Sequence, residues 1–380
     1  MLLQGLRVLD LTRLLPGPFC SLLLADMGAD VVKVEDPDGG DYLRHTAPPQ
    51  WFAGLNRGKR SLALDLSSSA GREVLLRLAA GADAVLEGFR PGVLDRWGIG
   101  WEQLRAVNPG LVLVSISGYG QTGPLAERAG HDLNYLARAG MLELARTPGE
   151  GPRPQAVQYG DLVAGGILPA MGTLAAVLSA RATGEGCHVD AAMFDGLLFL
   201  QFVQVADRMA RQRPPRPGEQ ALLGDLACYQ TYTTAEGDYI SLAALEPKFF
   251  KSFCLAVGRP DLVPLHLDLA AQPRLRAELA AIFAGRRRGQ WEQLSADCCL
   301  EPVLELGEAL AQPQTQARHL LRGLAPAAPF ALRWAGDWQR PPAGEPTAPA
   351  LGQHSRELLA GAGYTEDEIA ALVGAGTVGR

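Results

Sequence analysis

The sequence has few cysteines, and none of them is spaced for metal binding. Its 380 residues contain six cysteines, with no CxxC pair and no combination with histidine that has the spacing of a zinc site. Cys298 and Cys299 are adjacent, which is poor geometry for a disulfide between them. We therefore expect reduced and mostly buried thiols, a cytoplasmic location and no metal site.

The sequence also lacks an excess of basic charge. Lysine and arginine number 35 against 41 acidic residues, giving a net charge of −6. We therefore expect no nucleic acid and no anionic membrane as partner, and an anionic ligand requires a local basic patch. The N-terminus lacks the pattern of a signal peptide, and the C-terminus lacks a peroxisomal tripeptide.

Charge is missing altogether from one long stretch, Leu162 to Ala180, which approaches the length of a membrane-spanning helix. This stretch contains three glycines and one proline, and no belt of aromatic residues flanks it. We interpret it as a buried helix that another backbone approaches closely, in preference to a membrane span.

A GxGxxG dinucleotide fingerprint is absent after the first strand-like run, which argues against an NAD or FAD site. What is present is a regular alternation of two kinds of segment. Strand-like runs occur at residues 7–11, 30–34, 83–86 and 111–116, and helix-like runs at 19–27 and 71–80. This alternation predicts an α/β fold with a parallel, Rossmann-like sheet covered by helices.

We expect four segments along the chain. They are a large Rossmann-like domain (1–200), a linker rich in proline and arginine (201–224), a smaller α+β domain (225–320) and a segment that returns to the large domain (321–380). Alternating polar and apolar residues from Cys228 to Ala243 predict a hairpin in the smaller domain. A short helix is predicted near the end, from Thr365 to Val373.

Residues suited to proton transfer follow the most apolar strand-like run. His131 and Asp132 come after a glycine-rich loop at the carboxyl end of residues 111–116, where ligands bind in open parallel sheets. His131 either transfers a proton near neutral pH or is a structural histidine bonded to Asp132 or to backbone. Asp161 precedes the uncharged stretch, and is either a helix cap or a carboxyl group whose pKa is raised by desolvation.

Two groups of basic residues are candidates for binding phosphates. Arg57, Lys59 and Arg60 lie within four positions, and Arg90 follows the strand-like run at 83–86, with Arg96 six residues later. These residues are either solvated surface charges or contacts to a phosphorylated ligand such as coenzyme A.

Five segments, in order, resemble the family III CoA-transferase superfamily. They are residues 5–10, 24–35, 56–62, 87–92 and 118–124. Within this superfamily, Ala129 to Tyr135 resembles the α-methylacyl-CoA racemase branch, because transferases usually carry a different and often aromatic residue in place of His131. The racemases pair this histidine with the aspartate of a later Gly-Asp, here Asp161, and have a glutamate before proline, here Glu246.

The resemblance implies roles for particular residues. His131 and Asp161 would transfer protons, supported by Asp132 and Glu246. Besides Arg57, Lys59 and Arg60, the contacts to coenzyme A would come from Asp65, Leu66, Glu87, Gly88, Phe89, Arg90, Arg96, Gly130, Asn134 and Tyr135. The resemblance further implies the family III CoA-transferase fold, an interlocked homodimer and an acyl-CoA substrate. Coenzyme A is then part of the substrate, and no separate cofactor is expected.

The racemase interpretation implies racemisation of 2-methylacyl-CoA thioesters. One group removes the proton next to the thioester carbonyl, an enolate forms, and a second group returns a proton to the opposite face. Backbone N–H groups after Asp161 would hold the enolate oxygen. The alternatives are a CoA transferase with Asp161 as nucleophile, against which His131 weighs, and a CoA-binding protein that needs neither His131 nor Asp161.

Overall fold

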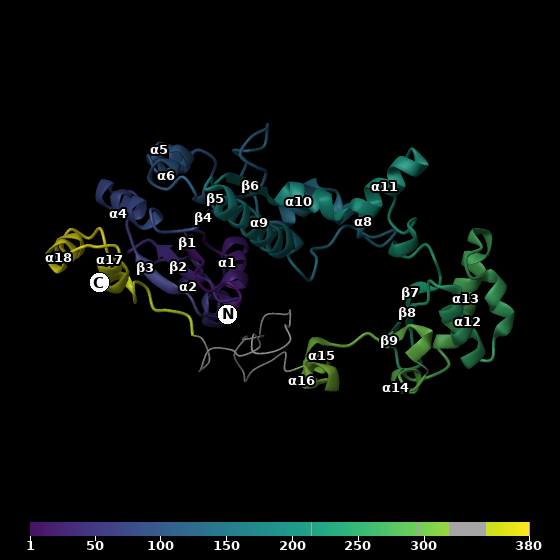
Figure 1. Ribbon diagram of the computed structural model, residues 1–380. Helices are drawn as coiled ribbons and strands as arrows, with labels where there is room; N and C mark the ends of the chain where they lie inside the picture. Colours follow the sequence, from purple (N-terminus) through teal and green to yellow (C-terminus); the bar gives the residue numbers. More distant parts are fainter. Residues whose placement is uncertain (214, 295, 319–346, 380) are drawn as a thin grey trace. The chain divides into compact units, whose positions relative to one another are not determined.

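The computed structural model describes residues 1–213, 215–294, 296–318 and 347–379 (Figure 1). The chain forms two compact units. Described residues of the first unit lie in 1–139, 154–201 and 347–379, and the second unit comprises residues 140–153 and the described part of 202–318.

The first unit contains a six-stranded sheet in the order β3-β2-β1-β4-β5-β6 (Figure 1). The strands are β1 (Arg7–Asp10), β2 (Asp30–Glu35), β3 (Arg60–Ala63), β4 (Ala84–Glu87), β5 (Val112–Ser117) and β6 (His188–Ala192). Every neighbouring pair is parallel, which confirms the predicted α/β class and parallel sheet. The strand order reverses between β1 and β4, and such a switch point is where open α/β sheets bind ligands, at the carboxyl ends of the strands.

Helices connect these strands and cover the sheet. They are α1 (Pro16–Asp26), α2 (Leu43–Thr46), α3 (Pro49–Asn56), α4 (Ser69–Ala79), α5 (Val93–Arg96), α6 (Trp101–Val107), α7 (Asp132–Arg138), η1 (Tyr159–Ile167), α9 (Leu168–Thr183), α10 (Met193–Leu200), α17 (Ser355–Gly361) and α18 (Glu366–Gly374). Gly28 has a φ of +102° just past the end of α1, a left-handed conformation that favours glycine and ends the helix.

Two hydrophobic cores lie on the two faces of this sheet. Val8 belongs to the core that α1 and α9 share, whereas Leu9 belongs to the core of α4, α6, α17 and α18. Consecutive strand residues point to opposite faces, so a strand buried on both faces has apolar residues at successive positions. All six residues of β5 are buried, which explains why its apolar run was the clearest strand signal in the sequence.

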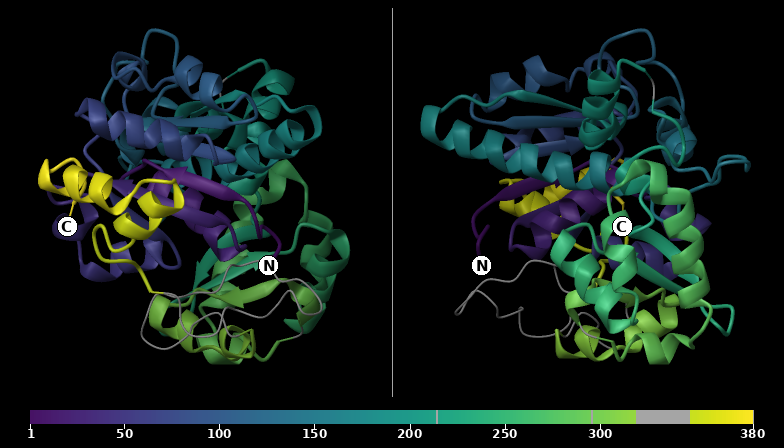
Figure 2. Two further views of the ribbon diagram at one scale, coloured as in Figure 1. Left: turned by 60° about the vertical axis from the view of Figure 1, so that its left-hand side comes forward. Right: turned by 90° about the vertical axis from the view of Figure 1, so that its right-hand side faces the viewer.

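The described C-terminal residues pack against the first unit. Leu359 and Ile369 join the core that contains Leu9, and Leu64 forms an antiparallel bridge with Val378. Figure 2 shows this yellow segment beside the purple N-terminal strands in both views. The predicted C-terminal helix corresponds to α18, and Thr365 caps it by accepting a hydrogen bond from the Glu368 N–H at 3.3 Å. Residues 321–346 and 380 of the predicted return segment lie outside the described residues.

The uncharged stretch lies within a continuous helix of 25 residues, Tyr159–Thr183, which consists of a π-helical part, η1, followed by α9. By length and composition alone it is apolar enough to cross a membrane, with a mean hydropathy of 1.8, a test that core helices of soluble proteins also pass. Only 39% of its most apolar window is buried, and Met171 and Leu178 are 64% and 70% exposed. The expectation of a buried helix is therefore correct along one side only, because just one side faces the sheet.

The second unit has a three-stranded antiparallel sheet, β7-β8-β9, with an aromatic core. Its elements are α8 (Met141–Leu144), α11 (Phe202–Arg211), η2 (Ala221–Leu223), β7 (Tyr229–Thr233), β8 (Tyr239–Ala243), α12 (Pro247–Ala256), η3 (Pro260–Leu265), η4 (Leu269–Ala271), α13 (Gln272–Phe283), α14 (Arg288–Trp291), η5 (Ala296–Cys298), β9 (Leu300–Pro302), α15 (Leu306–Ala311) and α16 (Pro313–Ala317). Strands β7 and β8 pair as the predicted hairpin.

The unit boundaries differ from the segments drawn from composition. Residues 140–153, placed in the large domain by the sequence, belong to the second unit. The expected linker contains helix α11, whose apolar and charged residues segregate to opposite sides. Proline and arginine content marked the end of this helix, after Arg211, and could not reveal the helix before it.

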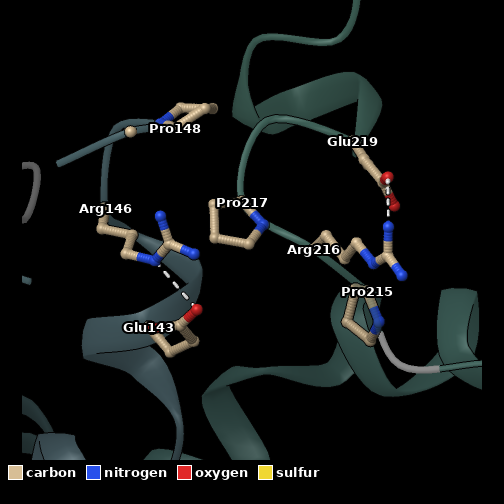
Figure 3. A pocket seen from close by; sticks show the side chains of 8 residues that line it. Glu143, Arg146, Pro148, Pro215, Arg216, Pro217 and Glu219 are labelled. Carbon is tan, nitrogen blue, oxygen red and sulfur yellow. Dashed lines mark hydrogen bonds and ion pairs between the residues drawn. The ribbon is translucent and has the colours of Figure 1, made fainter. Parts of the chain in front are cut away.

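A pocket in the second unit lies between the segment after α8 and a proline-rich loop (Figure 3). Its lining residues are Glu143, Arg146, Pro148, Gly149, Pro215, Arg216, Pro217 and Glu219. Arg146 pairs with Glu143 at 2.8 Å, and Arg216 with Glu219 at 3.9 Å, so each cation has an acidic partner close in sequence. Because none of the predicted site residues lines it, this pocket is not the candidate active site.

Candidate active site

The loop after β5 positions helix α7 through the side chain of Tyr135. The Tyr135 hydroxyl donates a hydrogen bond to the Gly130 carbonyl at 2.5 Å. A Cβ atom at Gly118 would lie 2.6 Å from the Tyr135 ring, so glycine is required there for the ring to reach the loop. The tyrosine thereby fixes the start of α7, where His131 and Asp132 lie.

Asp132 joins the start of α7 to the start of the π-helix η1. Its Oδ1 atom accepts hydrogen bonds from the backbone N–H groups of Gly160 at 2.7 Å and Asp161 at 3.1 Å. A Cβ atom at Gly160 would lie 2.8 Å from this oxygen, so a side chain there would disturb the contact. The structure therefore brings two predicted catalytic residues, Asp132 and Asp161, into one cluster.

The π-helical segment η1 packs closely on helix α1. A Cβ atom at Gly165 would meet Pro16 at 2.7 Å, and one at Gly166 would meet Phe19 at 2.6 Å, both from α1. These glycines therefore allow η1 to pack directly on α1, which follows the carboxyl end of β1. Short π-helical segments are frequent at functional sites.

The electrostatics of Asp161 suit proton transfer. Burial, and second the negative charge of Asp132, raise the pKa of Asp161 to about 7. Burial likewise raises the pKa of Asp132, against the two backbone hydrogen bonds that it accepts. A carboxyl group with a pKa near 7 is present in both protonation states at neutral pH, so it both donates and accepts protons.

His131 immediately precedes this acidic pair as the N-cap residue of α7. Its side chain is exposed, and its backbone N–H donates a hydrogen bond to Asn134 Oδ1 at 3.0 Å. Asn134 thus supports the turn that carries His131. The Leu162 N–H, the first after Asp161, donates a hydrogen bond to the Gln158 carbonyl at 2.8 Å, so this N–H group is not free to hold an enolate.

Glu87 fixes the loop after β4, where several contacts to coenzyme A were predicted. Its buried Oε2 atom accepts a hydrogen bond from the Phe89 N–H at 2.7 Å, and burial raises the pKa of Glu87 to about 7. Gly88 and Arg90 are exposed in this loop, as is Arg96 on α5. Phe89 packs edge-to-face on Trp97 with ring centroids 5.2 Å apart. Arg90 and Arg96 are therefore accessible to a ligand, whereas Glu87 orders the loop.

Three predicted phosphate contacts, Arg57, Lys59 and Arg60, have internal partners instead. Lys59 is fully buried and contacts Asp10 Oδ2 at 3.2 Å, and burial lowers the pKa of Lys59 to about 8. Arg57, which is 8% exposed, pairs with Asp26 at 2.5 Å.

Arg60 donates two hydrogen bonds to Asp30 and one to Glu357. The prediction for Lys59 is wrong, and the pairing of Arg57 and Arg60 favours a structural role for both. Among the other predicted contacts, Leu66 is buried, and Asp65 accepts a hydrogen bond from the Ser67 N–H at 2.8 Å.

Glu246 belongs to the second unit, where it precedes α12 as its N-cap residue.

Sequence reasoning missed Arg13, an exposed residue three positions after β1. Its guanidinium carbon lies 5.0 Å from the centroid of the Phe89 ring, directly beside the predicted contacts of the β4 loop. The sequence feature that could have identified Arg13 is its position just after the first strand, at the carboxyl end of the sheet.

A doubly wound parallel sheet with a switch point, and an acidic pair with a raised pKa near the carboxyl end of β5, define an α/β protein with a candidate site for proton transfer. The model of CoA-transferase family III matches residues 3–355, and the chain belongs to this family of enzymes. The resemblance that the five motifs indicated is thereby confirmed.

Curated and solved relatives span nearly the whole chain. An α-methylacyl-CoA racemase of Mus musculus is 35% identical over 98% of this chain and 96% of its own length. A succinyl-CoA–D-citramalate CoA-transferase of Chloroflexus aurantiacus is 33% identical, over 97% and 96%. A CAIB/BAIF family protein from Brucella suis, known by crystal structure, has a TM-score of 0.81 and 30% identity, covering 95% of this chain and 99% of that one. The chain is therefore about equally similar to a racemase and to a CoA-transferase.

Proposed function

We propose that this protein is a 2-methylacyl-CoA racemase that inverts the carbon next to the thioester by proton transfer through an enolate. The observation that carries the proposal is Asp161, whose pKa is raised to about 7 in a cluster with Asp132, next to His131. Similarity to the mouse racemase supports it.

Racemisation requires one proton carrier on each face of the substrate carbon. In one direction, neutral His131 takes the proton, the electron pair moves to the thioester oxygen, and protonated Asp161 returns a proton to the opposite face. The enzyme ends with imidazolium and carboxylate, which is the starting state for the other epimer. A carboxyl group with a pKa near 7 supplies both states with little free-energy cost at neutral pH.

The substrate is an acyl-CoA thioester, and the proposed reaction moves only protons, so it requires no cofactor beyond the coenzyme A of the substrate. We also propose that the protein works in the cytoplasm as an interlocked homodimer. The apolar side of α9 and α10 supports a partner, since Leu178 and Phe199 are each 70% exposed. We place Glu246 as a supporting residue of the site, as the family resemblance implies.

Exchange with solvent tests the proposal directly. Purified protein is incubated in deuterated water with (2R)- or (2S)-2-methylacyl-CoA and no acid acceptor. We expect deuterium at the α-carbon and a mixture of epimers from either start. Retention of the α-proton and of configuration across several acyl chains would contradict the racemase.

A CoA transferase is the second candidate, favoured by the 33% identity to the Chloroflexus transferase. There the Asp161 carboxylate would be acylated, giving an anhydride and then an enzyme-bound CoA thioester. Hydroxylamine converts either species to a hydroxamate, whereas a racemase only exchanges a proton at Asp161. Mass spectrometry of the peptide containing Asp161 distinguishes the two, and a hydroxamate together with CoA transfer to a free acid would establish the transferase.

A further inference from the structure

Arg13 lies at the switch point of the six-stranded sheet. It follows β1 by three residues, and its guanidinium carbon lies over the ring of Phe89, which follows β4. Strands β1 and β4 are the neighbours between which the strand order reverses. The crevice at the carboxyl ends of such a pair is where doubly wound sheets bind ligands.

A buried ion pair holds the backbone on both sides of Arg13. Lys33 Nζ donates to the Thr12 carbonyl at 3.0 Å, and the Leu14 N–H donates to Asp41 Oδ1 at 3.1 Å. Lys33 and Asp41 pair with each other at 2.9 Å, and both side chains are fully buried. The position of Arg13 is therefore set by groups that the surrounding core immobilises.

The same ion pair maintains a strained backbone conformation. Leu14 has a φ of +65°, in the left-handed region that a branched side chain rarely adopts. Non-glycine residues held in this region are concentrated at functional sites, where the surrounding structure enforces them. Here the turn directs the chain from β1 into α1 and leaves the Arg13 side chain exposed at the edge of the sheet.

Aromatic rings, not carboxylates, surround the guanidinium. Its carbon lies 5.0 Å from the Phe89 centroid and 5.7 Å from that of Tyr42, whose hydroxyl is 3.5 Å from Nη1. Within the described residues, Arg13 has no acidic partner at ion-pair distance. Arg57 and Arg60 each contact a carboxylate. Stacking on rings orients a guanidinium and leaves its N–H groups available to an anion.

We propose that Arg13 binds a phosphate group of the coenzyme A portion of the substrate, an inference that rests on the proposed function. Five N–H donors in a planar fork match the oxygens of a phosphate. The exposed Arg90, beside Phe89, adds positive charge to the same edge. The pyrophosphate and the 3′-phosphate share this chemistry, and ligand fragments distinguish them.

Direct binding measurements test this assignment independently of catalysis. Calorimetry compares wild type, Arg13→Gln, Arg13→Lys and the control Arg105→Gln, which changes an exposed arginine on α6. The ligands are coenzyme A, 3′-dephospho-coenzyme A, 4′-phosphopantetheine and pantetheine. We expect Arg13→Gln to weaken coenzyme A binding about tenfold or more, since a charge-assisted hydrogen bond contributes about 1.5 to 3 kcal/mol. Arg13→Lys should lose less, and Arg105→Gln nothing.

The fragments show which phosphate is bound and separate a direct contact from a structural effect. A loss that persists with 3′-dephospho-coenzyme A identifies the pyrophosphate, and one that vanishes identifies the 3′-phosphate. Equal losses with pantetheine, or no loss with coenzyme A, would overturn the assignment of Arg13 while leaving the proposed function intact. A wild-type protein that binds no coenzyme A would overturn both.

Discussion

Two clusters of partly or fully buried carboxylates in the first unit have opposite electrostatics. At the start of η1, Asp161 lies beside Asp132, and like charge together with burial raises the pKa of Asp161 to about 7. At the end of β1, burial is the largest influence on the pKa of Asp10 and raises it, yet the charges of Lys59 and Lys33, with hydrogen bonds from Ser21 and Thr12, hold this pKa below its usual value. Each cluster contains carboxylates removed from solvent, but among the described residues only the cluster of Asp10 has a cation paired with it.

The difference shows how a cluster of carboxylates that stabilises the fold can be distinguished from one that titrates near neutral pH. The carboxylate of Asp10 is paired and also accepts hydrogen bonds from Ser21 and Thr12, so it stays ionised and fixes the chain around it. Within the part of the chain that the structure describes, no cation lowers the pKa of the Asp161 carboxyl group, and its protonation state changes near neutral pH. Perturbed titration of this second kind is typical of functional sites.

The sharpest test of this comparison removes the titrating group. Asp161→Asn keeps the shape of the side chain and cannot transfer a proton, so we expect deuterium exchange into 2-methylacyl-CoA to fall by about 10³-fold. The control, Glu102→Gln, changes an exposed carboxylate on α6 and should leave exchange unchanged. Full activity of Asp161→Asn would show that the acidic pair is not the proton carrier.

Breaking the paired cluster should affect stability. Lys59→Met keeps the length of the side chain but leaves Asp10 with one lysine fewer in a fully buried site. We expect the free energy of unfolding in urea to fall by about 3 to 5 kcal/mol. Lys251→Met, at an exposed lysine, is the matched control. A loss below about 0.5 kcal/mol would mean that the network does not hold this region together.

The unpaired cluster should reduce stability in a pH-dependent way. The usual pKa of an aspartate is 3.8 and that of Asp161 is about 7, so the folded state binds the proton more tightly than the unfolded state does. The contribution of this group to stability is therefore present below about pH 4 and is lost as the pH rises through about 7.

Asp161→Asn should accordingly be more stable than wild type at pH 8, by about 2 kcal/mol after allowance for partial exposure, and equal to it at pH 4. Urea unfolding at both pH values measures this. A difference that does not change with pH would contradict the raised pKa, and Glu102→Gln should show no pH-dependent difference.

The smallest expected effect comes from neutralising the neighbour. In Asp132→Asn, the side-chain oxygen still accepts the Gly160 and Asp161 N–H groups, but the like charge is gone. The pKa of Asp161 should fall, while burial continues to hold it above 3.8. The limbs of the pH–rate profile for both epimers should move to lower pH by up to about one unit. Unmoved limbs would show that burial alone sets the pKa.

Local sequence was informative where one element is buried throughout or a turn needs a particular residue. The apolar run of β5 and the β7–β8 hairpin were both predicted. Strands β3 and β6 were missed because they form the two edges of the sheet and include polar residues such as Arg60 and His188. The π-helical form of η1 was also missed, as was its close packing at Gly165 and Gly166 on α1, which is distant in sequence.

In the candidate site, too, residues in local motifs were predicted and residues whose role depends on distant contacts were not. His131, Asp132 and Asp161 were predicted, because their motifs are short and local, and the structure brings Asp132 and Asp161 together. Lys59 was assigned to a ligand because its partners, Asp10 and Ser21, lie 49 and 38 residues away in sequence. Arg13 was overlooked for the converse reason, since its aromatic surroundings come from residues 42 and 89.

By itself, then, the sequence determined the α/β class, the family and the residue types available for proton transfer, because strand periodicity and motifs depend on neighbouring positions. The tertiary structure decided which charges are paired and which are not. Coulomb interaction and desolvation depend on distance and burial, which for Asp10, Lys59 and Asp161 are set by segments far apart in the chain. The same residue type therefore became structural at the end of β1 and titratable at the start of η1.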